Sequence, residues 1–172
     1  MLTAARTAVR KGLPLYHSQL AGVSDAAWTA LVQVLMVPLI GEKWKDGTPL
    51  QGEVRPLDFE GSTGDLGCFA LRQKHLVDLK LMRVVKDDNG RFVRNAFVRG
   101  DVDRFKANSL AQYDALSCLL RRYDSMLPRP DGMSRSGAVA LCHRAGPTGL
   151  VSWARRKLPA TVVLVGLADG LF

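Results

Sequence analysis

The sequence predicts a mainly α protein, a helical bundle around a central helix with one small β-hairpin. Apolar residues recur at helical spacing in several segments, and a single Asn-Gly pair stands between two short apolar runs. With 172 residues, of which 47% are apolar, the chain is long enough for one domain with a core. We expect an N-terminal extension over residues 1–23, followed by a single domain over residues 24–172.

The first predicted helix is the central one. Ser24 is a favourable N-cap, and the apolar run 28–40 follows it. Pro38 interrupts this run, so we expect a kink or an early end around Val37. Residues 41–60 then alternate glycine, proline and charged residues, which predicts a long irregular loop of the kind that often carries function.

The next helix is expected within residues 66–82, where the apolar spacing is closer to that of a helix than to that of a strand. Asn89-Gly90 predicts the hairpin, because this pair tolerates the positive φ angles of a two-residue turn. Capping residues and prolines predict three further helices. The first runs from Asn108 or Ser109 through Tyr123, and the second from Ser134 or Ser136 to near Arg144. The third is capped by Thr148 and covers residues 149–157.

The charge balance favours anionic partners. Lysine and arginine total 24 against 16 acidic residues, giving a net charge of +8. The resulting positive potential attracts polymers such as cell wall, DNA or acidic lipid. Because the basic residues are spread along the chain, a generally basic solvated surface is the simpler interpretation, and a dedicated polyanion groove is the alternative.

The sequence shows no pattern typical of a disulfide-linked, metal-binding, membrane-spanning or secreted protein. Cys68, Cys118 and Cys142 stand in apolar helical contexts, which indicates buried thiols rather than a disulfide. No metal-ligand spacing is present, so we expect neither a metal nor another cofactor. The apolar runs are too short to span a membrane, and the start of the chain lacks the apolar run of a secretory signal.

Three separate segments of the chain match, in the same order, the three parts of one known sequence signature. They are Gly64-Asp65-Leu66-Gly67-Cys68-Phe69, then Phe105 with Asn108, Gln112 and Ala115, and finally the turn 140–151 with His143 and Gly146. Together they resemble the signature of phage-type lysozyme-like and lytic transglycosylase domains, over roughly residues 26–157. The resemblance implies a lysozyme-like α+β fold that cleaves the glycan strands of peptidoglycan. It also implies a substrate cleft lined by Gly67, Phe69, Gln112 and His143.

Glycan cleavage needs a sheltered carboxylic acid that protonates the leaving oxygen, and lytic transglycosylases use one glutamate. The chain has three glutamates. Glu42 ends the apolar helix, as the family glutamate does, whereas Glu53 has the better spacing to Gly67. Glu60 is the least favoured of the three. The alternative for all of them is a solvated loop carboxylate, and the alternative for His143 is a structural histidine near a helix end.

Two departures from the family pattern keep a second function open. Ala70 replaces the sugar-contacting glutamine, and neither Glu42 nor Glu53 is followed by the usual Ser-Gly or Gly-Gly. One function is cleavage of peptidoglycan with Glu42, or failing that Glu53, as general acid and base. The other is a catalytically inert, lysozyme-fold structural component of a virion or tail, with other virion or tail proteins as partners. Either function agrees with a protein that is virion-associated, or cytoplasmic before delivery.

A third hypothesis concerns residues 136–157, which resemble a helix-turn-helix. Arg155, Arg156 and Lys157 on the second helix could make non-specific contacts with DNA phosphates. Few polar side chains accompany them that could read bases. We therefore expect at most a non-specific DNA contact from this segment.

Overall fold

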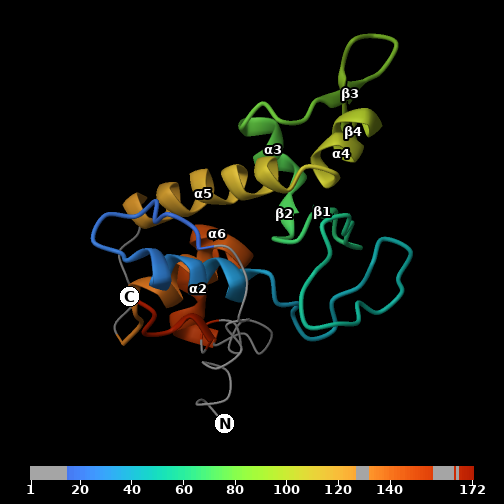
Figure 1. The fold of residues 1–172 in the computed structure, drawn as a ribbon. Coiled ribbons are helices and arrows are strands. Elements are labelled where there is room, and N and C mark those ends of the chain that lie inside the picture. Colours follow the sequence, from blue (N-terminus) through green and yellow to red (C-terminus); the bar gives the residue numbers. More distant parts are fainter. Residues whose placement is uncertain (1–14, 127–131, 157–164, 166) are drawn as a thin grey trace. The chain divides into compact units, whose positions relative to one another are not determined.

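The structure is a computed structural model that describes residues 15–126, 132–156, 165 and 167–172. Its described part is mainly helical, with two short antiparallel sheets, which confirms the mainly α class with a minor β part (Figure 1). The helices are α2 (Asp25–Leu35), α3 (Gln73–Asp78), α4 (Arg99–Lys106), α5 (Ser109–Met126) and α6 (Arg135–Arg156). The strands are β1 (Asp65–Leu66), β2 (Leu71–Arg72), β3 (Val84–Lys86) and β4 (Phe92–Phe97).

The chain divides into two compact units. The described residues of 15–40 and 117–172 form one, here called the terminal unit, and residues 41–116 form the other, the central unit. Residues 15–23 of the predicted extension belong to the terminal unit, where the backbone N–H of Ser18 donates to Asp25 Oδ1 at 2.7 Å. Residues 1–14 lie outside the described residues.

In the terminal unit, α2 begins and ends where the sequence predicts. Ser24 Oγ accepts a hydrogen bond from the N–H of Ala27 at 3.2 Å, which caps the helix. The helix ends at Leu35, before Pro38, so the predicted early end is confirmed. Its buried apolar residues, Trp28, Leu31, Val32 and Leu35, belong to the core of this unit, where α2 packs against α6.

Helix α6 consists of two segments separated by a break. Gly146 has φ 73° and ψ 174°, and Pro147 follows it directly. Proline suits the first turn of a helix, because the N–H that it lacks would have no partner there. The helix predicted to start near Ser134 is confirmed, with Ser134 Oγ accepting from the N–H of Gly137 at 3.1 Å. The next segment starts before the predicted cap at Thr148, and its expected end at Lys157 lies outside the described residues.

In the central unit, residues 41–60 contain no helix or named strand, as predicted. Isolated bridges join Lys43 to Pro49 and Trp44 to Gly61. The ring of Trp44 meets the fully buried ring of Phe59 edge to face, with centroids 5.3 Å apart. This long loop is therefore held in place by backbone pairing and by an aromatic contact.

The helix predicted over residues 66–82 is only partly confirmed. Strands β1 and β2 pair antiparallel, with Leu66 opposite Leu71, and α3 begins only at Gln73. Gly67 with φ 72° and Ala70 with φ 49° turn the chain back between the two strands. The helical prediction was wrong at residues 66–72. Residues 66–71 are all buried, so their apolar side chains do not show the alternation of buried and exposed positions by which a strand is recognised.

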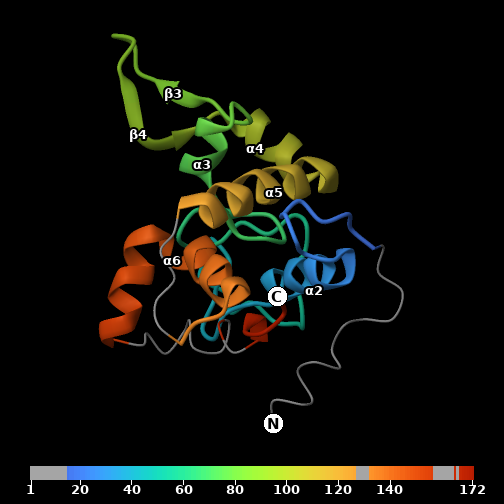
Figure 2. The ribbon, with the colours of Figure 1, turned by 90° about the vertical axis from the view of Figure 1, so that its left-hand side faces the viewer.

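The predicted hairpin is confirmed as β3 and β4, but the two-residue turn predicted at Asn89-Gly90 was wrong. The N–H of Asp87 donates to the carbonyl of Arg91 at 2.9 Å, so three residues close the turn, and of Asn89 and Gly90 only Gly90 has a positive φ. The φ of Gly90 is 75°, and Asp87 Oδ1 accepts hydrogen bonds from the N–H groups of Asn89 and Arg91 at 2.9 and 2.8 Å. Lys86 pairs with Phe92, and the register becomes irregular before the next pair. In both ribbon views the turn points away from α3 and α4 (Figures 1 and 2).

Helix α4 follows the hairpin and was not predicted, because Gly100 and five charged residues give it a weak apolar pattern. Helix α5 was predicted correctly: Asn108 Oδ1 accepts from the N–H of Ala111 at 3.0 Å. None of the described helices combines the length and apolar character that a bilayer crossing requires. The three cysteines are free thiols, and burial raises the pKa of Cys68 and Cys142 to about 12.

Candidate functional site

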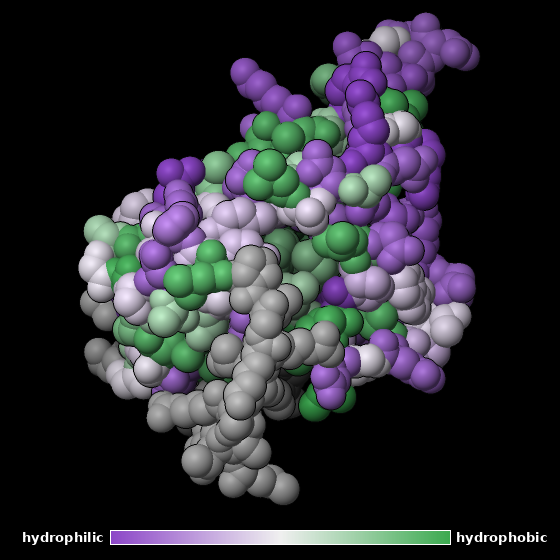
Figure 3. Space-filling model, viewed as in Figure 1, coloured by the Kyte–Doolittle hydropathy of each residue, from purple (hydrophilic) through white to green (hydrophobic). Residues whose placement is uncertain are grey.

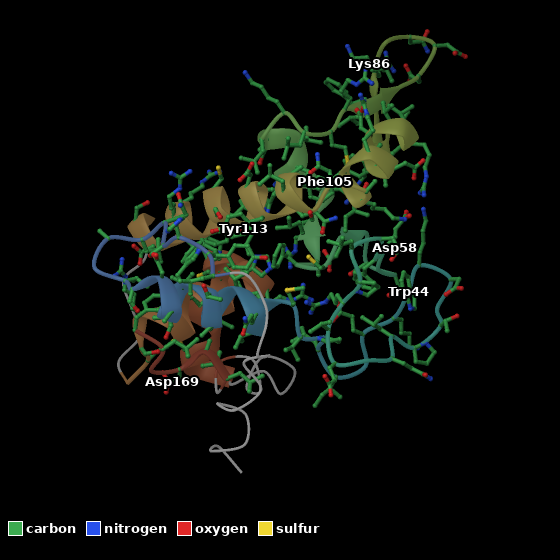
Figure 4. All side chains as sticks on the ribbon, viewed as in Figure 1. Trp44, Asp58, Lys86, Phe105, Tyr113 and Asp169 are labelled. Atoms are coloured by element: carbon green, nitrogen blue, oxygen red, sulfur yellow. The ribbon has the colours of Figure 1, made fainter. Side chains whose placement is uncertain are left out.

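The segment of residues 64–69, here called the glycine segment, and the start of α5 meet at one side chain, Gln112, which is fully buried in the central unit. Its Oε1 accepts a hydrogen bond from the N–H of Cys68 at 2.9 Å. Its Nε2 lies 3.0, 3.1 and 3.1 Å from the carbonyl oxygens of Leu57, Phe105 and Lys106, respectively. One carboxamide thus ties together the long loop, the β1–β2 turn and the end of α4. Trp44 on the long loop and Phe105 on α4 are labelled in Figure 4.

Gly67 fits against this carboxamide because it has no side chain. Its φ of 72° lies in the left-handed region, and a Cβ built on it would overlap Oε1 of Gln112. Its N–H donates to the carbonyl of Phe59 at 2.8 Å. Two residues of the sequence motif that are 45 positions apart are therefore in direct contact.

The other predicted substrate-binding residues are also interior. Phe69 is 2% exposed and follows Gly67 within the β1–β2 turn. Gly67, Phe69 and Gln112 thus lie together in the central unit, with their side chains or backbone committed to its core. His143 belongs to the terminal unit, where it is buried on α6 three residues before the break at Gly146.

Glu42 is bound by a buried arginine. Arg55 Nε donates to Glu42 Oε1, and Arg55 Nη2 donates to Glu42 Oε2, both at 2.8 Å. The Arg55 side chain is 1% exposed and the Glu42 side chain 10% exposed. Arg55 Nη1 also lies 3.5 Å from the carbonyl oxygen of Cys68. This bidentate pair joins the start of the long loop to its later half and to the glycine segment.

Glu60 lies among three cations. Lys45 Nζ is 2.6 Å from Oε1, whereas Arg99 Nη1 and Lys106 Nζ are 2.8 and 3.3 Å from Oε2. Burial raises the pKa of Glu60, but the hydrogen bonds from these cations outweigh it and hold the pKa at about 2, below the ordinary 4.5. The carboxylate is therefore charged at neutral pH.

Glu53, by contrast, is exposed on the long loop. A second buried carboxylate, Asp101, accepts hydrogen bonds from Arg83 and Arg104. The hydrogen bond from Arg83 holds the pKa of Asp101 well below its usual range. Sequence reasoning missed Arg55, Asp101 and the cations around Glu60, because a lone charged residue in a loop or short helix carries no spacing that identifies its partner.

Chemically, Glu42 and Glu60 act as acceptors for fixed cations. A general acid must instead enter the reaction protonated, in a dry environment that disfavours its charge. Among the described residues, no three acidic, histidine or cysteine side chains gather as metal ligands.

The proposed helix-turn-helix can be followed only in part. Leu150 is buried on α6, whereas nothing is described of the side chains of Arg155 and Arg156, and Lys157 lies outside the described residues. The chain matches no protein-family model, no curated protein and no solved structure.

Proposed function

We propose that this chain is a catalytically inert, lysozyme-like structural component of a virion or tail, with other virion or tail proteins as its partners. The observation that carries the proposal is the bidentate pair between Glu42 and the buried Arg55. Glu42 is the first of the two candidates for the general acid, with Glu53 as the second. An arginine that donates to both oxygens of Glu42 stabilises the ionised carboxylate, which is the wrong state for protonating a leaving group.

The other two glutamates support the same interpretation. The pKa of Glu60 is held at about 2 by hydrogen bonds from Lys45, Arg99 and Lys106 that outweigh its burial, so proton donation near neutral pH is disfavoured. Glu53 is exposed, so it lacks the dry surroundings that a catalytic carboxyl group needs. Each candidate thus lacks one requirement of the cleavage reaction.

The motif residues have another role that accounts for their presence. Gln112 and Gly67 fit each other inside the central unit, and Gln112 ties three chain segments together. A protein that loses catalysis but keeps its scaffold needs such contacts for stability. The motif therefore fits a structural component as well as it fits an enzyme.

Glycan cleavage by Glu42 is the second candidate, and one observation favours it. The Glu42 side chain is only 10% exposed, as a sheltered general acid must be. In that case substrate binding would have to displace Arg55 from the carboxylate. Glu53 would be the next choice, with a role only if the loop closes over substrate.

A release assay on purified peptidoglycan separates the two candidates. The folded parent, Glu42→Gln, Glu53→Gln and the exposed-carboxylate control Asp114→Asn are incubated with dye-labelled peptidoglycan, and soluble fragments are analysed by mass spectrometry. We expect no release above the buffer blank from any of them. Release by the parent and the control that is lost in Glu42→Gln or Glu53→Gln would replace the structural proposal with the enzymatic one.

A fractionation experiment tests the structural role directly. Particles produced by cells that encode the chain are banded on a density gradient and probed for it. We expect the chain to band with intact particles and to remain with them after a salt wash. A chain found only in the soluble fraction would contradict a structural role.

A further inference from the structure

We propose that the β3–β4 hairpin binds single-stranded nucleic acid, with its cations on the phosphates and Phe92 stacked on a base. The hairpin combines basic residues with an exposed aromatic ring, which is the combination that single-strand binders use. The hairpin residues that form this site take no part in the ion pairs of Glu42 and Glu60 described above and do not belong to residues 136–157. The inference goes beyond the structural role proposed above and does not depend on it.

Phe92 is the first element of the proposed site. It begins β4 and is 71% exposed, which is unusual for a large aromatic side chain. The neighbouring Val93 is 39% exposed. Since neither side chain contributes much to the core, the exposed ring is available for stacking.

Lys86 is the second element. It pairs with Phe92 across the hairpin, and its Nζ lies 5.1 Å from the centre of the Phe92 ring. Figure 4 labels Lys86 on the hairpin. A positive charge and an aromatic ring are thus presented side by side on the hairpin, and these are the two groups that a single-strand binder offers to phosphate and base.

Arg91 and Arg94 extend the positive surface on both sides of Phe92, and both are exposed. Among the described residues, no carboxylate forms an ion pair with Lys86, Arg91 or Arg94. The other arginines at the base of the hairpin differ, since Arg83 pairs with Asp101 and Arg99 with Glu60. The three unpaired cations are therefore the ones that can bind phosphate.

The acidic residues of the turn define how a strand would lie. Asp87 is occupied by the N–H groups of Asn89 and Arg91, whereas Asp88 is exposed at the tip. A phosphate would be repelled at the tip and attracted along the flank of the hairpin. The tip of the hairpin is hydrophilic on the face seen in Figure 3, which favours a polar, charged partner there.

The test measures the anisotropy of a labelled oligothymidylate of about 20 nucleotides, longer than the ~4–16 nucleotides of a typical single-strand site. The hairpin triple variant, Lys86→Gln with Arg91→Gln and Arg94→Gln, is compared with a matched triple, Lys43→Gln with Lys74→Gln and Arg122→Gln. Both remove three exposed cations, so the net charge falls equally. We expect the hairpin triple to weaken binding at least about tenfold and to lower the salt slope by up to about 2, and the matched triple to change affinity less than about twofold.

A second pair of variants tests the ring. Phe92→Leu keeps an apolar side chain but removes the aromatic face, whereas Phe92→Trp keeps that face. We expect about a tenfold loss of affinity in Phe92→Leu and none in Phe92→Trp. Because these side chains are exposed, thermal melting should show all variants folded like the parent.

Four outcomes would overturn the inference. They are no binding of the parent at low salt, equal losses in the two triples, unchanged affinity in Phe92→Leu, and binding of a matched duplex as tight as binding of the single strand. Binding to phosphatidylglycerol vesicles without binding to the oligonucleotide would equally reject it in favour of a lipid surface.

Discussion

Gly67 and Gln112 fit each other so closely that a Cβ at position 67 would overlap the Oε1 of Gln112. The same oxygen accepts the hydrogen bond from Cys68, so it cannot move without releasing a buried N–H. A glycine and a glutamine far apart in the sequence thus form one packed contact. Substitution of each residue in turn tests what the contact contributes to stability.

Gly67→Ala should lower the free energy of unfolding by about 2–4 kcal/mol, because positive-φ strain adds to the overlap with Gln112. Urea denaturation measures the loss. Gly64→Ala is the matched control: its φ is 84°, but a Cβ there would meet only Gln73 Nε2, at an ordinary 3.5 Å. It should cost about 1–2 kcal/mol. Equal losses in the two variants would show that the overlap contributes nothing.

Gln112→Leu should destabilise the protein by about 2–4 kcal/mol, because it leaves a buried N–H and buried carbonyl groups without their partner. Urea denaturation again provides the measurement. Gln73→Leu is the control, since Gln73 is half-buried and donates one hydrogen bond, to the carbonyl of Gly64 at 2.8 Å. It should cost less than about 1.5 kcal/mol. A Gln112→Leu variant no less stable than the control would contradict the structural role of the carboxamide.

Much of the fold could be predicted because its signals are local. The cap at Ser24, the stop before Pro38 and the Asn89-Gly90 turn each act on the chain within a few residues. The strand pair at residues 65–72 could not be predicted, since the turn depends on Ala70 adopting a positive φ that its residue type does not suggest. Burial from surrounding segments decided the structure there.

The site was less predictable than the fold. The sequence motif predicted that Gly67, Phe69 and Gln112 line one cleft. The structure places these three residues together in the interior of the central unit. The ion pairs of Glu42 and Glu60 depend on contacts between residues that are 13 to 46 positions apart. No rule of sequence spacing links such pairs, so the cations that bind Glu42 and Glu60 could be identified only from the structure.

Glu60 should make stability depend on pH in acid. Since its folded pKa of about 2 lies below the ordinary 4.5, its contribution is complete above about pH 4.5 and is lost as the pH falls toward about 2. Glu60→Gln should therefore cost about 1–2 kcal/mol at neutral pH, a value reduced by solvent screening of Lys45 and Arg99. Near pH 2 the difference from the parent should shrink. Urea denaturation at a series of pH values measures both.

The control for this pH dependence is Asp114→Asn, which removes one exposed acidic charge from α5 that, in the described part of the chain, forms no ion pair with the cations around Glu60. It should change the free energy of unfolding by less than about 0.5 kcal/mol over the same range. If Glu60→Gln and the parent differ by a constant amount down to the lowest pH, the cations do not hold the Glu60 carboxylate as the distances indicate.

The Glu42–Arg55 pair should be strongly coupled. Arg55→Met leaves the largely buried Glu42 carboxylate without its bidentate donor, and should cost about 3–5 kcal/mol. Glu42→Gln combined with Arg55→Met should be less destabilising than the sum of the two single changes, by at least about 1 kcal/mol, because the double variant leaves no unpaired buried charge. A double-mutant cycle in urea measures this coupling energy.

Arg135 and Asp124 in the terminal unit provide the comparison for that cycle. They form an equally bidentate pair at 2.6 and 2.7 Å, but their side chains are 27% and 20% exposed. Since solvent screens this pair more, its coupling energy should be the smaller of the two. A coupling at Glu42–Arg55 no larger than this would mean that Arg55 does not hold Glu42 in its charged form, and would return Glu42 to consideration as a proton donor.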